Sequence, residues 1–327
     1  MKKVYVCCPG GVVTGGPELL HQFVHELRDN GVDAHIVYMP FNKSFDVPEQ
    51  YKNYNVSVAD YNSTSFSTAV VVLPEVNTGM ANKFEGAQIV IWWLSVDFYF
   101  SYSGNRPVKE FIYDKINLLL GRRLPILKLK KFSHYVQSEY AHQFLKGHHI
   151  ESKMLTDYIG HTHLNGINFS EDIPNRERII AFNPKKGIPF TQKLINKNND
   201  IKFVPLINMT PLEVRKLLLR AMIYIDFGNH PGKDRFPREA AMAGCCIITG
   251  IKGSAGNEYD VSIPSKYKLN EEGDDAFVKF KMLVDDIFSD FTSNSVEFDD
   301  YRKKIKNEPS CFKKQVLNFI KIELLGN

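Results

Sequence analysis

Residues 223–250, IYIDFGNHPGKDRFPREAAMAGCCIITG, place two apolar strand-like segments on either side of a short loop and a helix of small residues. This order is typical of a parallel sheet, whose strands are joined by crossover helices. Cations at the mouth of such a helix favour a phosphate-bearing ligand, because the helix start presents unpaired N–H groups and partial positive charge. The alternative is a solvated cluster in which Asp234 pairs with Arg235 or Arg238. The charged residues of the loop are His230, Lys233, Asp234 and Arg235.

The composition narrows the class of protein. A chain of 327 residues with 43% hydrophobic and 24% charged residues is long enough for two domains of about 150 residues each. A formal charge of +4 and a pI near 8.6 are too mild for a nucleic-acid-binding face, so no nucleic-acid partner is expected. The five cysteines form no C-x-x-C pair and indicate buried, reduced thiols rather than metal ligands. No apolar window is long enough for a signal peptide or a membrane span, so a cytoplasmic protein is expected.

The first part of the chain predicts an α/β domain. A strand at 4–8, a glycine-containing loop, a helix at 18–30 and a strand at 34–39 form a βαβ unit. Gly31 closes the helix at the position that favours glycine. Further buried strands are expected at 69–73, 89–94 and 134–137.

A second α/β domain follows a polar stretch that begins near Leu164. Thr210-Pro211-Leu212-Glu213 predicts a helix start with a threonine N-cap, proline at N1 and glutamate at N3. The predicted boundaries are 1–165 for the first domain, 166–310 for the second and 311–327 for a C-terminal helix that packs back on the first. The fold class is α/β, with two doubly wound Rossmann-like domains that face a cleft. The predicted strands are 179–182, 201–205, 223–227 and 246–249, and the predicted helices are 190–196, 210–221 and 237–243.

The glycine-rich loop after the first strand, residues 9–17, lies where a phosphate-binding turn would be expected. Its glycines do not follow the G-x-G-x-x-G spacing, and no acidic residue ends the second strand to bind a ribose. We therefore expect no nicotinamide or flavin cofactor. Gly15 and Gly16 are predicted to let an acceptor approach the backbone, with a purely structural turn as the alternative.

A second basic turn, Asn183-Pro184-Lys185-Lys186-Gly187, follows the first strand of the second domain. Together with residues 201–226, with Glu239-Ala240-Ala241-Met242-Ala243-Gly244 and with Gly256-Asn257-Glu258, it resembles the nucleotide-sugar-binding half of GT-B glycosyltransferases. The resemblance is to the retaining group with the E-x₇-E signature, and it covers residues 179–258 well and the first domain only in outline. In this chain Pro231 stands where the first glutamate of that signature would be.

The resemblance implies roles for several residues. Glu239 would bind the ribose hydroxyls of a nucleotide sugar, while Lys186 and one of Lys233 or Arg235 would meet the diphosphate. Cations there would stabilise the charge on the departing diphosphate, so no metal or other cofactor is implied. Because Pro231 replaces a glutamate, the stereochemical outcome stays open. The full set of implied donor-binding residues is Lys186, Gly232, Lys233, Arg235, Glu239, Asn257 and Glu258.

Catalytic candidates come from both predicted domains. The segment 89–100, IVIWWLSVDFYF, ends a buried strand with Asp97, a candidate general base for an inverting reaction. Trp93 is a candidate acceptor-side aromatic, because aromatic rings stack on sugar rings, with core packing as the alternative. His230 is the second catalytic candidate. The weaker alternatives are His21, His25, His161 and His163.

Residues 121–132, GRRLPILKLKKF, combine five cations with leucine and isoleucine and contain no acid. Such a segment is suited to peripheral contact with an anionic membrane, and a solvated loop is the alternative. The sequence thus predicts a membrane-associated hexosyltransferase at the inner face of the membrane. It would move a sugar from a nucleotide-activated donor to a cell-surface polysaccharide or lipid-linked glycan. The alternative is a glycosyltransferase-like protein that binds a glycan or partner without catalysis.

Overall fold

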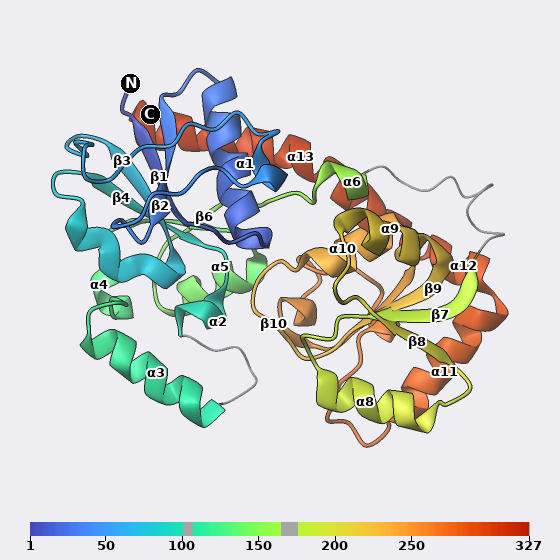
Figure 1. The fold of residues 1–327 in the computed structure, drawn as a ribbon. Helices are drawn as coiled ribbons and strands as arrows, with labels where there is room; N and C mark the ends of the chain where they lie inside the picture. The colour runs from blue at the N-terminus through green and yellow to red at the C-terminus, as the bar shows by residue number, and fades with distance from the viewer. Residues whose placement is uncertain (101–106, 165–175, 327) are drawn as a thin grey trace. The chain divides into compact units, whose positions relative to one another are not determined.

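The computed structural model describes residues 1–100, 107–164 and 176–326, and the predicted domain boundary at residues 165 and 166 lies outside them. The chain divides into two compact units (Figure 1). Unit 1 consists of Met1–Tyr158 together with Glu308–Asn327, and unit 2 is Ile159–Asn307. None of the helices in the described residues is both long and apolar enough to cross a membrane.

Unit 1 is built on a six-stranded sheet in which every pair of neighbouring strands is parallel. Its spatial order is β2-β1-β3-β4-β5-β6. The βαβ pattern of the sequence predicted the parallel pairing but not this order. The strands are β1 (Val4–Pro9), β2 (Ala34–Met39), β3 (Val70–Pro74), β4 (Gln88–Trp93), β5 (Ser133–Val136) and β6 (Lys153–Met154).

Both faces of this sheet are covered, so its strands are apolar at successive positions rather than at alternate ones. On one face Trp92 packs edge-on against Phe23 of α1, and on the other Trp93 packs against Tyr99. The helices of unit 1 ahead of its C-terminal segment are α1 (Gly15–Asp29), η1 (Glu49–Tyr51), η2 (Glu75–Lys83), α2 (Val96–Tyr99), α3 (Pro107–Leu119), α4 (Ile126–Leu129) and α5 (Glu139–Gly147).

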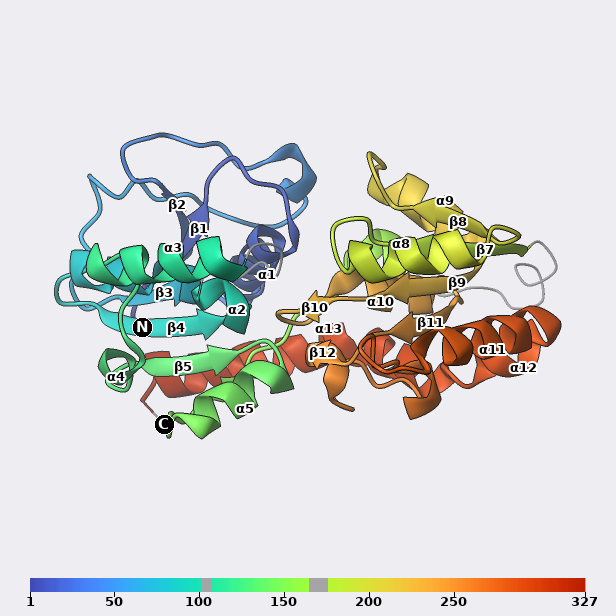
Figure 2. The same ribbon diagram turned by 90° about the horizontal axis from the view of Figure 1, so that it is seen from below.

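Unit 2 contains a four-stranded parallel sheet in the order β11-β9-β7-β8, visible in the view of Figure 2. A second, two-stranded parallel ladder joins the loop after β9 to the loop after β11, and the sequence did not predict it. The strands are β7 (Glu177–Phe182), β8 (Lys202–Pro205), β9 (Ala221–Asp226), β10 (Asn229–His230), β11 (Cys246–Thr249) and β12 (Lys252–Gly253).

The helices of unit 2 begin with the short α6 (His161–Leu164), followed by α8 (Ile188–Lys197). The predicted capping box is present at the start of α9 (Pro211–Arg220), where the Thr210 N–H donates to Glu213 Oε2 at 2.7 Å. The remaining elements are α10 (Arg235–Met242), η3 (Ser254–Gly256), η4 (Ser265–Tyr267), α11 (Ala276–Ser289) and α12 (Phe291–Val296).

The C-terminal helix α13 (Asp299–Phe319) runs longer than the predicted 311–327 and ends in a π-helical turn, Ile320–Leu324. Its last part belongs to unit 1, where Phe319 packs edge-on against Phe23 with ring centroids 5.0 Å apart. The buried Glu323 carboxylate accepts hydrogen bonds from Tyr135 Oη at 2.9 Å and from Gln88 Nε2 at 2.6 Å. These contacts complete the core of unit 1 with residues from the far end of the chain.

Candidate functional site

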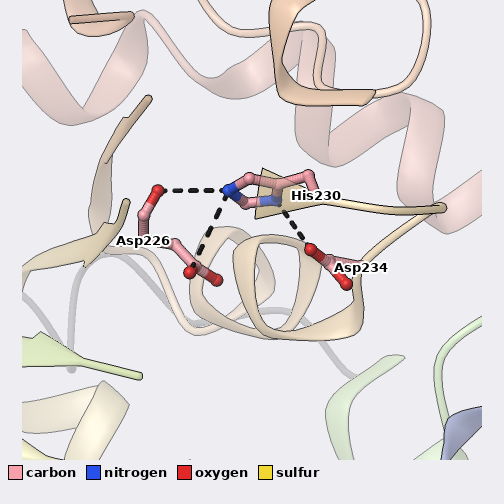
Figure 3. A group of neighbouring side chains, drawn as sticks. All are labelled: Asp226, His230 and Asp234. Atoms are coloured by element: carbon pink, nitrogen blue, oxygen red, sulfur yellow. Dashed lines mark hydrogen bonds and ion pairs between the residues drawn. The ribbon is translucent and has the colours of Figure 1, made fainter. Parts of the chain in front are cut away.

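The candidate site lies at the carboxyl edge of the unit 2 sheet, where the turns after β7 and β9 come together. Lys186 follows β7 and contacts Asp234, which directly precedes α10. His230 lies in β10, and its Nδ1 is 2.7 Å from Asp234 Oδ2 (Figure 3). Ligands of open α/β sheets bind outside this edge of the strands, so the sequence brings its basic residues to the appropriate place.

The turn after β7 is tightly fitted to the turn after β9. Gly187 has a φ of +55°, and a Cβ added to it would lie 2.3 Å from the backbone carbonyl of Phe227. Only glycine fits such a backbone contact without a shift of one of the two chains. The close approach holds Lys186 beside the loop that carries His230 and Asp234.

His230 is surrounded by acceptors. Its Nε2 lies 3.2 Å from the Asp226 carbonyl oxygen, its Nδ1 faces the Asp234 carboxylate, and its side chain is fully buried. Oxygen atoms near both ring nitrogens favour the imidazolium form, in which each nitrogen carries a proton. Burial lowers the pKa of His230, but the carboxylates of Asp226 and Asp234 outweigh it, and the net shift is upward.

The pKa values of the two carboxyl groups beside His230 are shifted in opposite directions. Burial would raise the pKa of Asp234, but Lys186 and His230 outweigh it and hold the pKa at about 2. Burial dominates at Asp226 and raises its pKa, and one of its oxygens accepts a hydrogen bond from Tyr224 Oη at 2.8 Å. Its other oxygen accepts no hydrogen bond from the residues that the structure describes.

Asp226, His230 and Asp234 also present three ligand atoms within 4.8 Å of one another, a spacing that a metal ion could bridge. The donor set does not fit a metal site, because Lys186 contacts the same Asp234 oxygen that faces His230. An ammonium and an imidazolium already balance this carboxylate. The group is therefore better described as an ion network than as a metal centre.

The loop that carries the network is fixed by side chains behind it. The fully buried Arg238 donates from Nε to the Asp234 carbonyl at 3.2 Å and from a terminal nitrogen to the Lys233 carbonyl at 3.1 Å. Ser254 Oγ donates to the Gly232 carbonyl at 2.5 Å. Lys233 and Arg235 remain half-buried on the outer side of this loop. The sequence singled out the loop's cations, whereas the bracing by Arg238 and Ser254 depends on tertiary contacts.

Glu239 lies one helical turn into α10, and its side chain is 12% exposed. Its Oε2 is 3.9 Å from Nε2 of His163 in α6, a residue 3% exposed. The sequence named both residues but did not predict that they meet. Their separation in the chain is too large for any local pattern to reveal the pair.

The remaining predicted donor residues lie after β12. Asn257 Oδ1 accepts the backbone N–H groups of Tyr259 and Asp260, and its Nδ2 donates to the Asp260 carboxylate at 2.7 Å. The Asn257 side chain therefore shapes its own turn. Glu258 is exposed.

The predicted acceptor-side residues all belong to unit 1. Asp97 lies in α2, is 9% exposed and accepts a hydrogen bond from Tyr140 Oη at 3.2 Å. Gly15 and Gly16 form the first turn of α1, three residues before the predicted helix start at 18. Trp93 is fully buried, and its indole N–H donates to His134 Nδ1 at 3.0 Å. Trp93 thus has the core position that was the alternative to contact with an acceptor.

Glu75 is a buried acidic residue that was not among the functional residues predicted from the sequence. It follows β3 directly, is 2% exposed and accepts the Leu94 N–H at 2.8 Å, next to the turn that leads to Asp97. Burial raises its pKa to about 8. The available signal was an acidic residue placed immediately after a fully apolar strand.

Comparisons with known proteins bear on the fold. No protein-family model and no curated protein matches the chain. Among solved structures, Anabaena HepE in complex with UDP-glucose has a TM-score of 0.66 at 10% identity, over 98% of this chain and 100% of that one. Sucrose-phosphate synthase from Thermosynechococcus elongatus reaches 0.69 at 8% identity, over 100% of both chains. A glycosyltransferase from Rickettsia africae reaches 0.64 at 14% identity, over 100% of this chain and 99% of that one.

These matches extend over nearly the whole chain, and they agree with the two parallel sheets described above. The chain has an α/β fold of the Rossmann-like type in both units. More specifically, it has the fold of GT-B glycosyltransferases.

Proposed function

We propose that the protein is a glycosyltransferase that uses a nucleotide-activated sugar as donor. The observation that supports it most is the meeting of Lys186, His230 and Asp234 at the carboxyl edge of the unit 2 sheet, in a chain with the GT-B fold. HepE was solved with UDP-glucose, and an α-glucosyltransferase with UDP. A uridine diphosphate sugar is therefore the first donor to test.

In this proposal the donor diphosphate is bound by Lys186, with Lys233 or Arg235 as the second cation. Lys186 is already held by Asp234, so less side-chain freedom is lost when an anion binds. Cations near the leaving diphosphate would stabilise the negative charge that develops there. Glu239 would accept the ribose hydroxyls, with Gly232, Asn257 and Glu258 at the margin of the donor site.

The proposed acceptor is a cell-surface polysaccharide or lipid-linked glycan at the inner face of a membrane. Asp97 is the proposed general base for an inverting reaction, with His230 as the second catalytic candidate. His230 is fully buried between two acceptors, so the more direct contribution that its geometry supports is electrostatic. Gly15 and Gly16 are the proposed points of acceptor approach.

The proposal is tested by Glu239→Ala, with Glu272→Ala as the matched control because Glu272 lies in an exposed ion pair with Lys252. Donor consumption would be measured with UDP-, GDP-, CDP-, CMP- and dTDP-sugars. We expect the Glu239 variant to lose at least about a hundredfold in rate, the usual cost of one essential polar contact at a transition state. Wild-type activity in this variant would refute the role of Glu239.

The diphosphate contact is tested by Lys186→Ala against Lys185→Ala, its exposed neighbour in the same turn. We expect Lys186→Ala to weaken the nucleoside diphosphate about tenfold or more and to leave the nucleoside itself nearly unchanged. Calorimetric titration of both ligands measures the difference. Equal losses for the two ligands would contradict the proposed contact.

A second function is favoured by Pro231, which replaces the first glutamate of the retaining signature that the sequence resembles. A non-catalytic protein that binds a glycan or partner would have no need of that residue. Titration with a panel of nucleoside diphosphates separates the two functions, because a binding protein of this kind should show no nucleotide affinity.

A further inference from the structure

Helix α3 presents its apolar side chains outward. Phe111, Ile112 and Leu119 are 54%, 52% and 85% exposed, and they fall on one side of the helix by its 3.6-residue period. The opposite side is polar, with Asp114 only 6% exposed and Asn117 half-buried. A helix at the surface of a protein in water normally has the reverse arrangement.

The inward polar side of α3 has a specific partner. The Asp114 carboxylate lies 2.7 Å from a terminal nitrogen of Arg123, and both side chains are less than 10% exposed. Arg123 also lies over the ring of Tyr99, with its guanidinium carbon 4.7 Å from the ring centroid. This buried pair fixes the rotation of α3 and so keeps the apolar side facing out.

The apolar surface continues past the end of the helix. Leu120 is 60% exposed, Leu127 of α4 is 78% exposed, and α3 and α4 both lie at the margin of unit 1 (Figure 1). Within the predicted membrane segment 121–132, in contrast, Leu124 and Leu129 are buried. That segment alone therefore offers little apolar surface, and α3 supplies most of it.

Cations surround this surface. Residues 107–132 contain seven lysines and arginines against two acids, and one of those acids, Asp114, is buried with Arg123. Exposed cations flank the apolar side chains at Lys109, Lys115, Arg122, Lys128, Lys130 and Lys131. A second copy of the chain docked face to face would bring these positive charges together, which disfavours self-association.

A pocket of about 540 Å³ opens beside the end of α3. Its lining combines apolar side chains with cations. The apolar residues include Val76, Met80, Phe98 and Leu120, and the cations include Lys83 and Arg122. This combination matches a ligand with an apolar part and an anionic head. The pocket and the outward face of α3 share Leu120 and therefore form one continuous surface.

We propose that the outward face of α3, with Leu120, Leu127 and the flanking cations, docks on an anionic lipid bilayer. Phenylalanine and leucine enter the boundary between headgroups and acyl chains, while lysine and arginine meet anionic headgroups. The inference deepens the proposed function, because a bilayer is where a lipid-linked acceptor would be found. Binding to vesicles needs no nucleotide sugar, so it can fail or succeed independently of glycosyl transfer.

The docking is tested with the full chain by flotation on vesicles of neutral phosphatidylcholine and on vesicles with about one-third phosphatidylglycerol. We expect binding to the anionic vesicles, weakened by salt, and at least tenfold weaker binding to neutral ones. Phe111→Ser/Leu119→Ser should lose at least tenfold in binding to the anionic vesicles. The matched control is Val278→Ser/Met282→Ser on α11, which removes two side chains that are 62% and 66% exposed.

A single variant reports the depth of insertion without removing apolar surface. The two native tryptophans, Trp92 and Trp93, are fully buried, so Leu119→Trp places the only exposed indole of the described chain on α3. Its emission should shift to the blue when anionic vesicles are added. The proposal is overturned if wild type does not float with anionic vesicles. It is also overturned if the α3 and α11 double variants bind equally, or if the α3 variant instead dissociates a dimer seen by light scattering.

Discussion

In unit 1, Glu75, His21 and His134 are buried, and burial shifts the pKa of each group toward its uncharged form. Burial raises the pKa of Glu75 to about 8 and lowers the pKa of both histidines. In unit 2, the pKa values of the fully buried His230 and the partly buried Asp234 are shifted toward the charged forms, because each faces the other and Lys186 faces Asp234. Burial thus sets the direction of the pKa shift at these three groups of unit 1, whereas counter-charges set it at His230 and Asp234.

This difference indicates different tasks for the two sheet edges. A neutral carboxyl at the end of β3 supports the neighbouring turn through the Leu94 N–H. A charged network at the end of β9 maintains cations at the surface where an anionic ligand would bind. The edge of the unit 2 sheet is therefore the stronger candidate for contact with a diphosphate.

The largest expected effect on the free energy of unfolding is that of Glu75→Gln. This substitution keeps the shape of the side chain and removes its titratable carboxyl group. A carboxyl whose folded pKa lies above its unfolded value stabilises fully below the unfolded pKa and loses that contribution as pH rises through the folded pKa. With values of 4.5 and about 8, wild type should lose up to about 4 kcal/mol relative to the variant between pH 5 and pH 9.

Urea unfolding of wild type and Glu75→Gln across this pH range measures the effect, with the exposed Glu85→Gln as control. Parallel curves for wild type and Glu75→Gln would show that Glu75 is charged in the folded protein. The contrast between the two units would then be lost.

A smaller effect is expected at Gly187, which tests how tightly the two turns of the unit 2 edge are fitted. In Gly187→Ala the new Cβ would overlap the Phe227 carbonyl and the residue would keep its positive φ, at a cost of about 3 kcal/mol. Gly31→Ala in unit 1 is the matched control, because Gly31 has a φ of +77° and no atom within 4 Å of the added Cβ.

For Gly31→Ala we expect the free energy of unfolding to fall by about 1 kcal/mol, the cost of the backbone conformation alone. Thermal unfolding of both variants gives the comparison. If the two variants were equally stable, the overlap at Gly187 would be relieved by a shift of the turn.

The smallest expected effect is on the pH dependence of stability, to which His21 and His230 contribute with opposite signs. The raised pKa of His230 stabilises the fold below about pH 6.5, and this contribution is lost as pH rises through the folded value. The lowered pKa of His21 has the reverse sign, because below about pH 6.5 the unfolded chain takes up a proton that the folded chain does not.

The advantage of wild type over His230→Asn should therefore shrink with rising pH, and its advantage over His21→Asn should shrink with falling pH. Unfolding free energies between pH 5 and pH 8.5 measure both slopes. Slopes of the same sign would contradict the opposite pKa shifts of the two histidines.

Much of the fold could be predicted from local patterns. The strand at 34–39 and the strand at 246–249 were predicted with their observed bounds, because each is an apolar run bordered by residues that end strands. The capping box at Thr210 was readable because its parts lie three residues apart. The strands β10 and β12 were not predicted, because two residues are too few to show any period.

Other features depend on partners far apart in the sequence. Trp93 was a candidate acceptor contact, and its burial follows from packing against Tyr99 and His134. Helix α3 was missed because its apolar side faces outward and its polar side faces Arg123, the reverse of the usual pattern. The charge state of His230 depends on Asp226 and Asp234 together, which a sequence can suggest only as a cluster.

Unit 1 is made from both ends of the chain, and this has a consequence for the order of events on the ribosome. All of Ile159–Asn307 is synthesised before Glu308–Asn327, so unit 2 can fold while unit 1 still lacks its last segment. Until then the surface of α1 that will receive Phe319 stays open, and Tyr135 and Gln88 lack the Glu323 carboxylate. A chain truncated before residue 308 should leave unit 1 as the part exposed to chaperones and proteases.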